Sequence, residues 1–162
     1  MNKREVYDYL KQLGIWHEIT EHQAVYSMAE AANVPLPYPE GDAKNLLIRD
    51  DKKAHYYLLT VKGDRRVDLK AFRQQNGTRR LSFASAEDLQ RLLGVIPGAV
   101  TPLGLLNDTA HQVALYLDQA FLEAPGIIGV HPNENTATVW LRVTDLVTLL
   151  RQRGTAVQVV AF

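Results

Sequence analysis

Three short blocks of the chain carry residue types that could act on a substrate. They are Lys44-Asn45, the segment GVIPGAVTPLGLLND at 94–108, and Gly129-Val130-His131-Pro132 with Asn135-Thr136 beyond it. Together they offer an ammonium, amides, an imidazole and backbone N–H groups, which can hold a ligand but do not pair a nucleophile with a base. No GxSxG, HExxH, P-loop or Rossmann fingerprint occurs, so named motifs leave the reaction open.

The histidines and the lack of cysteine bear on metal and covalent chemistry. The chain has no cysteine, which excludes disulfides, cysteine zinc sites and thiol nucleophiles. The histidines are scattered and none has a second histidine at a short ligand spacing; they are His17, His22, His55, His111 and His131. We therefore expect no metal ion and no cofactor.

The composition is that of one globular domain covering residues 1–162. Of these residues 46% are hydrophobic and 22% are charged, so a core can form without disulfides. The start of the chain lacks the apolar segment of a secretion signal, and no run of 18 apolar residues occurs. These features predict a cytoplasmic protein without a membrane partner.

The charges balance overall but are unevenly spread. The net charge is −4 over residues 1–43, +6 over 44–91 and −2 over 92–162. The basic middle block suits local phosphate contacts but is too modest for a general DNA binder, so no DNA partner is expected. Solvated charges beside turns are the alternative interpretation.

Local signals predict an α+β domain. Helices are expected after Asn2 with Glu5, after Ser27 with Glu30, from Asp68 to about residue 75, from Ser85 to Gly94, and over 144–153. Strands are expected at 15–20, 46–49, 54–61, 81–83, 113–117, 127–131, 136–141 and 157–161. Because helices and strands do not alternate strictly, we expect one mixed, curled, barrel-like sheet with surrounding helices.

Two segments cannot form regular structure. The stretch 34–42 contains three prolines and is expected to be a surface loop leading into the site. The segment 94–108 is apolar but is broken by glycines and prolines, and an apolar irregular segment of this kind usually forms the wall of a cavity.

The whole chain resembles the YbaK/prolyl-tRNA synthetase insertion-type editing deacylases, especially their free-standing Ala-tRNA(Pro) deacylase branch, the ProX or PrdX group. The resemblance is carried by His22, Lys44-Asn45-Leu46, the stretches at 66–70 and 80–84, the segment 94–108, and His131-Pro132. It implies a hydrolase that removes alanine wrongly attached to tRNA(Pro). Such an ester is already activated, so the protein needs only to place a water, polarise the carbonyl and exclude the larger amino acid.

The resemblance also implies roles for single residues. Lys44 would hold the terminal phosphate or the ester carbonyl, Asn45 would orient it or the substrate, and His131 would line the aminoacyl pocket. Six further residues would form the pocket wall: Gly98, Thr101, Pro102, Gly104, Gly129 and Asn135. From the residues alone, Lys44 could instead be a solvated lysine at a strand end, His131 a structural histidine, and the segment 94–108 a compact buried loop.

The acceptor end of tRNA(Pro) would be the partner of the basic block, with prolyl-tRNA synthetase as a further candidate partner. The phosphate-contacting candidates are Lys52, Lys53, Lys62, Arg65, Arg66, Arg73, Arg79 and Arg80. Two other functions stay open: a deacylase for another mischarged tRNA, such as Cys-tRNA(Pro) or a Ser- or Thr-linked tRNA, and a non-catalytic tRNA- or synthetase-binding module.

Overall fold

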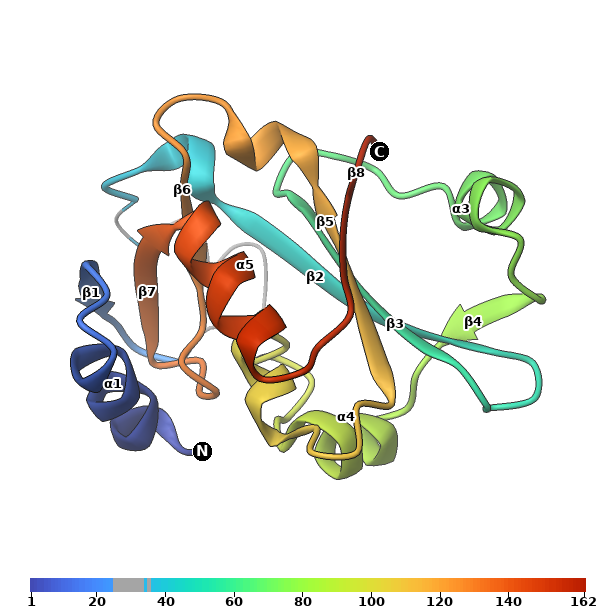
Figure 1. The fold of residues 1–162 in the computed structure, drawn as a ribbon, viewed down its shortest axis with the longest axis horizontal. Helices are drawn as coiled ribbons and strands as arrows, with labels where there is room; N and C mark the ends of the chain where they lie inside the picture. The colour runs from blue at the N-terminus through green and yellow to red at the C-terminus, as the bar shows by residue number, and fades with distance from the viewer. Residues whose placement is uncertain (25–33, 35) are drawn as a thin grey trace.

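The computed structural model describes residues 1–24, 34 and 36–162 as an α+β fold (Figure 1). Its helices are α1 (Lys3–Gln12), α3 (Leu69–Asn76), α4 (Ala86–Leu93) and α5 (Val143–Gln152), with 3-10 helices η1 (Pro39–Gly41), η2 (Pro102–Asn107) and η3 (Gln119–Leu122). Its strands are β1 (His17–Glu21), β2 (Ala43–Asp50), β3 (Tyr56–Lys62), β4 (Leu81–Phe83), β5 (Val113–Asp118), β6 (Ile127–Val130), β7 (Ala137–Arg142) and β8 (Val157–Val160). The helix expected after Ser27 lies outside the described residues.

Side-chain caps begin three of these helices as the sequence predicts. The side chains of Asn2 and Ser85 accept hydrogen bonds from the backbone N–H groups of Glu5 and Asp88. The carboxylates of Glu5 and Asp88 accept in return from the backbone N–H groups of Asn2 and Ser85, which completes two capping boxes. Asp68 caps α3 in the same way through a single bond. The segment 94–108 is more regular than expected, because Thr101 caps the six-residue helix η2 inside it.

The strands form two sheets. The larger has the order β4-β2-β3-β5-β8, with antiparallel pairs on the β2 side and parallel pairs at β3–β5 and β5–β8. The smaller has the order β1-β7-β6 and is antiparallel. The larger sheet is mixed, as predicted, but the strands divide between two sheets instead of forming one. Among the described residues no pairing joins the ends of either sheet, so the expected barrel-like closure is not seen.

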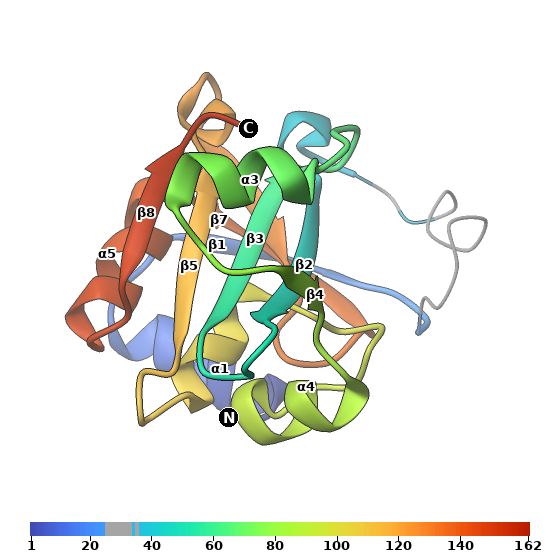
Figure 2. The ribbon, with the colours of Figure 1, turned by 90° about the vertical axis from the view of Figure 1, so that its right-hand side faces the viewer.

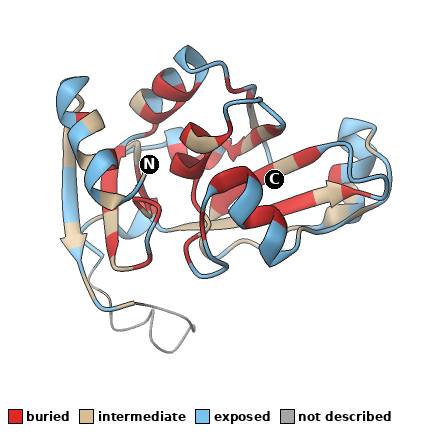
Figure 3. Ribbon diagram, turned by 90° about the horizontal axis from the view of Figure 1, so that it is seen from below, coloured by how far each residue is buried: buried red, intermediate tan, exposed pale blue. Residues whose placement is uncertain are grey.

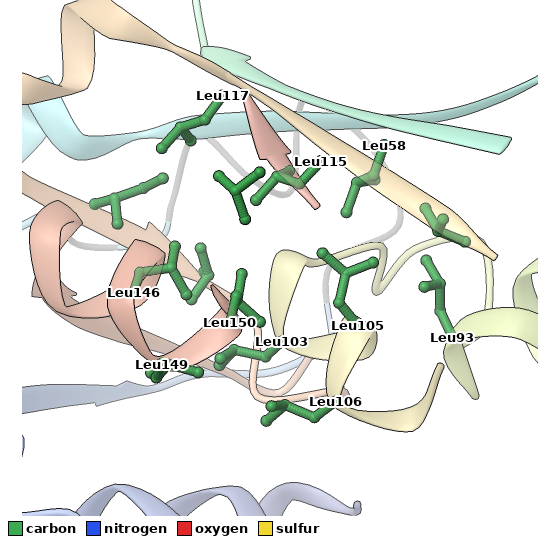
Figure 4. Packing of buried hydrophobic residues seen from close by; sticks show 14 of the residues in the cluster. Leu58, Leu93, Leu103, Leu105, Leu106, Leu115, Leu117, Leu146, Leu149 and Leu150 are labelled. Atoms are coloured by element: carbon green, nitrogen blue, oxygen red, sulfur yellow. The ribbon is translucent and has the colours of Figure 1, made fainter. Parts of the chain in front are cut away.

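The main core lies between the larger sheet and the elements that cover one of its faces (Figure 4). Leu58 and Leu115 project from β3 and β5 toward Leu146 and Leu150 of α5 and Leu103 of η2, and all five are fully buried. A smaller cluster around Phe72 forms on the opposite face, where α3 crosses the sheet (Figure 2). The larger sheet is therefore covered on both faces.

The α-helices carry both buried and exposed residues (Figure 3). In α5, for example, Leu146, Leu149 and Leu150 are buried while Arg151 and Gln152 are exposed. Within the described parts of the chain, no helix is both long and apolar enough to cross a membrane.

The two sheets meet where the first residues of β2 approach β6 (Figure 1). Helix η1, just before β2, packs on β6 so closely that a side chain at Gly41 would overlap the carbonyl of Ile127. This junction brings the residues after the proline-rich stretch next to the Gly129–His131 block.

Candidate functional site

A cavity of about 270 Å³ lies at the junction of the two sheets. We call it the central cavity; its lining comes from Leu36, Asp42, Ala43, Asn45, Pro97, Gly98, Val100, Gly129, Val130, His131, Thr138 and Trp140. It is smaller than the usual range for drug-sized ligands, which begins at ~300 Å³. The space suits one small group with a few polar contacts.

Asn45 presents its amide to the central cavity with a defined orientation. Asn45 pairs with Thr60 across β2 and β3, and the buried Thr60 hydroxyl donates to Asn45 Oδ1 over 2.6 Å. Because the oxygen is engaged, the N–H groups of this amide are the donors that can reach a ligand. The predicted site residue Asn45 therefore lines the cavity as a hydrogen-bond donor.

His131 lines the same cavity and is held from two sides. Its Nδ1 lies 3.0 Å from the carbonyl oxygen of Ala137, and its own carbonyl accepts a hydrogen bond from Thr101 Oγ1 over 2.7 Å. A carbonyl only accepts, so Nδ1 carries the proton and Nε2 is the acceptor of the neutral ring. Burial lowers the pKa of His131, which favours that neutral form.

The ring of His22 packs edge-on against His131, with 6.3 Å between the ring centroids. His22 Nε2 also lies 3.2 Å from Thr138 Oγ1, and Thr138 is part of the cavity wall. The positive charge that His22 can carry opposes protonation of His131 and so also lowers the pKa of His131.

Trp140 forms one wall of the central cavity, and its ring leaves no room for a side chain at position 129. The two residues are paired across β6 and β7, and a Cβ at position 129 would lie 2.5 Å from the indole ring. The indole N–H donates to Thr20 Oγ1 over 3.0 Å, and Tyr38 packs on the ring. Gly129 therefore allows close approach, as predicted, but the group that approaches it in this structure is Trp140.

Asp42 is a cavity residue that the sequence reasoning missed. Its side chain is exposed where the central cavity meets a second space, the outer groove, and it is part of both linings. The rest of the outer groove is lined by Pro39, Glu40, Lys62, Gly63, Asp64, Arg65, Ala120 and Glu123. Desolvation by the surrounding protein raises the pKa of Asp42, and His131 opposes that rise. Only its place between a proline-rich stretch and Lys44 could have drawn attention to it.

Lys44 does not line the central cavity. Side chains alternate along a strand, so Lys44 points to the face of the larger sheet opposite Asn45. Its ammonium donates to the backbone carbonyl of Arg65. The structure thus separates the two adjacent residues that the sequence places in one site.

The segment 94–108 contributes to the cavity only through its first half. Gly98 lines the cavity, whereas Thr101, Pro102 and Gly104 are buried beside it. A Cβ at Gly104 would lie 2.9 Å from Leu93 Cβ, so this glycine serves the contact between η2 and α4. Asn135 is also buried and outside the cavity lining.

The basic residues divide between the two ends of the larger sheet. Arg66 is exposed just after β3, at the cavity end. Four exposed residues lie beyond the other end of β2, and they are Lys52, Lys53, Arg79 and Arg80. The strand rises about 17 Å from Asn45 to Asp50, which separates these residues from the cavity.

Two of the predicted RNA contacts pair with carboxylates of the protein itself. Arg65 Nε lies 2.6 Å from the buried carboxylate of Asp118, and Nη1 donates to the carbonyl of Phe162. Arg79 pairs with the exposed Asp51.

In the described part of the chain, no three His, Asp or Glu side chains converge as a metal site would require.

Comparisons with known proteins identify the family. The family described as aminoacyl-tRNA editing domain matches residues 22–149. The prolyl-tRNA editing protein ProX of Acetoanaerobium sticklandii is 36% identical over 94% of this chain and 92% of its own. The prolyl-tRNA synthetase associated domain-containing protein 1 of Bos taurus is 34% identical over 90% of this chain and 86% of its own.

The fold agrees with this assignment. The solved structure of a candidate trans-editing enzyme for prolyl tRNA synthetase superposes with a TM-score of 0.71 at 24% identity, covering 99% of this chain and 96% of that one. At that identity the match supports the fold alone. Together with the sequence matches, it shows that the chain belongs to the YbaK/ProX-type aminoacyl-tRNA editing domain family.

Proposed function

We propose that this protein is a trans-editing deacylase that hydrolyses mischarged Ala-tRNA(Pro) to alanine and tRNA(Pro). The observation that carries the proposal is the central cavity, where the Asn45 amide and the neutral imidazole of His131 face one small space. Membership in an aminoacyl-tRNA editing family supplies the substrate class. The relative named for prolyl-tRNA editing supports tRNA(Pro) as the tRNA.

The polar groups of the cavity suit hydrolysis of an activated ester. In the proposed complex, the N–H groups of Asn45 donate to the ester carbonyl and stabilise the oxyanion that forms when water attacks. His131 Nε2 accepts a hydrogen bond from the ester end or from the attacking water. Neither residue forms a covalent bond to the substrate, since an aminoacyl ester needs only a positioned water and a polarised carbonyl.

The cavity walls supply the proposed size selection. Trp140, itself held by Thr20 and Tyr38, closes one side, and the residues around Gly98 close another. A pocket shaped to a methyl side chain rejects a proline ring by steric clash, which is how a second editing site works.

Lys44 keeps its proposed role at the terminal phosphate, acting from the opposite face of the larger sheet. Arg66 is the exposed basic residue at the cavity end and is proposed to contact the acceptor end there. Lys52, Lys53 and Arg80 are proposed to contact phosphates further along the acceptor stem. Arg65 and Arg79 are weaker candidates for RNA contacts, because each already pairs with a carboxylate of the protein itself.

The test is release of amino acid from tRNA(Pro) charged separately with Ala, Pro, Cys or Ser, measured over the uncatalysed rate with and without a chelator. We expect rapid, chelator-insensitive loss of alanine only. Asn45→Ala should lose this activity, while Gln152→Ala, which removes an exposed side-chain amide at the end of α5, should keep it.

Other outcomes separate the alternatives. Release of cysteine or serine with alanine retained would assign another mischarged substrate. Tight tRNA binding without release of any amino acid would leave a binding module as the function.

A further inference from the structure

Among the described residues that line the central cavity, Asp42 is the one with an acidic side chain. Among the described residues no Lys or Arg lies within ion-pair distance of its carboxylate, and positions 25–33 and 35 contain neither residue type. The two cations that line the outer groove with Asp42 have other partners: Lys62 donates to the carbonyl of Glu40, and Arg65 pairs with Asp118. Asp42 is therefore an anion without a cationic partner in the described structure.

The packing around Asp42 fixes where this charge lies. Gly63 leaves room for the carboxylate, since a Cβ there would lie 2.7 Å from Asp42 Oδ2. The backbone of Gly63 also donates to the Asp42 carbonyl over 2.9 Å, which ties the end of β3 to the start of β2. The titratable groups that affect Asp42 are His131 across the cavity and Asp64 on the outer side.

An aminoacyl ester brings a cation into this space. Its α-ammonium group sits on the carbon next to the ester carbonyl, so a carbonyl placed at Asn45 carries the ammonium into the same cavity. Covering an ammonium without a partner is costly, and neutral His131 cannot act as a counter-ion. We propose that the Asp42 carboxylate binds the α-ammonium of the aminoacyl group, so that the site selects esters with a free amino group. The inference rests on the proposed function and adds a charge criterion to its size criterion.

The test compares two substrates, one with the α-ammonium and one without it. Ala-tRNA(Pro) is treated with nitrous acid to give lactyl-tRNA(Pro), in which a hydroxyl of similar size replaces the ammonium. The hydrolysis rate of both substrates is measured with the wild type, Asp42→Asn and Asp64→Asn. Asp64 is the matched control because it lines the outer groove but not the central cavity. The two esters differ in intrinsic reactivity, but that difference cancels when each variant is compared with the wild type on the same substrate.

We expect Asp42→Asn to lose about tenfold in kcat/KM on Ala-tRNA(Pro), which lies between the loss of an exposed ion pair and the loss of a buried hydrogen bond to a charged group. The same variant should stay near wild type on lactyl-tRNA(Pro). Asp64→Asn should stay near wild type on both. An equal loss on both substrates would overturn the inference and make Asp42 a base or a structural residue. No loss on either would also overturn it.

A binding measurement keeps this test separate from the proposed function. The probes are 3′-(L-alanylamino)-3′-deoxyadenosine and its lactyl counterpart, two stable amides that need no turnover. If no charged tRNA is hydrolysed, the proposed function fails, while a tenfold preference for the alanyl probe that Asp42→Asn removes still supports ammonium binding. Equal dissociation constants for the two probes on the wild type would refute it whatever the turnover.

Discussion

Asn45 makes two different interactions in this structure, and two substitutions separate them. Its Oδ1 accepts from the buried Thr60 hydroxyl, and its N–H groups are available to a ligand in the central cavity. Asn45→Asp keeps an oxygen for Thr60 but replaces the N–H donors by a second oxygen. Thr60→Val keeps the donors but removes the hydroxyl that orients them. Asn45→Asp should therefore reduce activity much more than stability, whereas Thr60→Val should reduce stability and change activity only modestly.

The magnitudes follow from the two environments. Loss of one oxyanion donor typically costs 10²–10³ in kcat, or ~2.7–4 kcal/mol, so Asn45→Asp should lose at least ~100-fold in single-turnover deacylation of Ala-tRNA(Pro). Its free energy of unfolding should change little, because the Thr60 hydroxyl still has an acceptor. Thr60 is fully buried, so Thr60→Val should lower the free energy of unfolding by about 1 kcal/mol and reduce kcat only a few-fold.

Single-turnover rates and urea unfolding of the three proteins test this reasoning. The double variant Asn45→Asp/Thr60→Val should be no slower than Asn45→Asp alone, because Thr60 acts on the rate only through the amide donors. An Asn45→Asp protein with kcat within threefold of wild type would refute the oxyanion role. A Thr60→Val protein as inactive as Asn45→Asp would show that the hydroxyl itself takes part.

Three further predictions concern the rest of the site. Lys44→Ala should abolish deacylation while the melting temperature stays unchanged; near-wild-type turnover would show that the ammonium only holds the carbonyl of Arg65. Gly129→Ala should push Trp140 from its place, lowering the free energy of unfolding by ~1–3 kcal/mol in urea titration and changing the cavity, and an unchanged midpoint would contradict the contact. Because burial lowers the pKa of His131, the unfolded chain takes up a proton below about pH 6.5 that the folded one does not, so stability should fall as pH falls through that value. The melting temperature of His131→Gln should fall less between pH 7.5 and 5.5, and an equal fall would exclude this contribution.

Sequence reasoning predicted best those features that depend on local chemistry. Asn2, Asp68 and Ser85 each begin a helix because a short polar side chain can satisfy a backbone N–H group within the same turn. Such signals lie within four residues of each other and need no tertiary structure. The same holds for Gly94, which ends α4 in the left-handed conformation.

The separation of Lys44 from Asn45 was not predictable, because it depends on where the strand begins. The sequence places the strand after Asn45, and in that case both side chains could have pointed into one site. The structure begins β2 at Ala43, so both residues lie within the strand and point to opposite faces. A shift of three residues in one strand boundary therefore changed which residue reaches the cavity.

Other features of the site depend on contacts between distant segments. Trp140 lies against Gly129, and Asp118 engages Arg65, but neither pairing leaves a pattern in the sequence. Gly129 is expected to allow close approach of a substrate, and in the structure it also makes room for an indole ring. Arg65 is expected to contact RNA, and in the structure it pairs with a buried carboxylate. A residue type indicates which interactions are available, and the fold decides which partner is used.

The polar groups of the central cavity are held in place before any ligand arrives. Thr60 orients the Asn45 amide, and the Ala137 carbonyl and Thr101 hydroxyl hold His131. Each supporting group comes from an element other than that of the residue it holds, so the site is assembled only when the two sheets and η2 pack together. Donors fixed in this way need no reorganisation during the reaction, which is the condition under which electrostatic stabilisation is most effective. Substitutions in this supporting set should therefore lower both the rate and the free energy of unfolding, as worked out above for Thr60→Val.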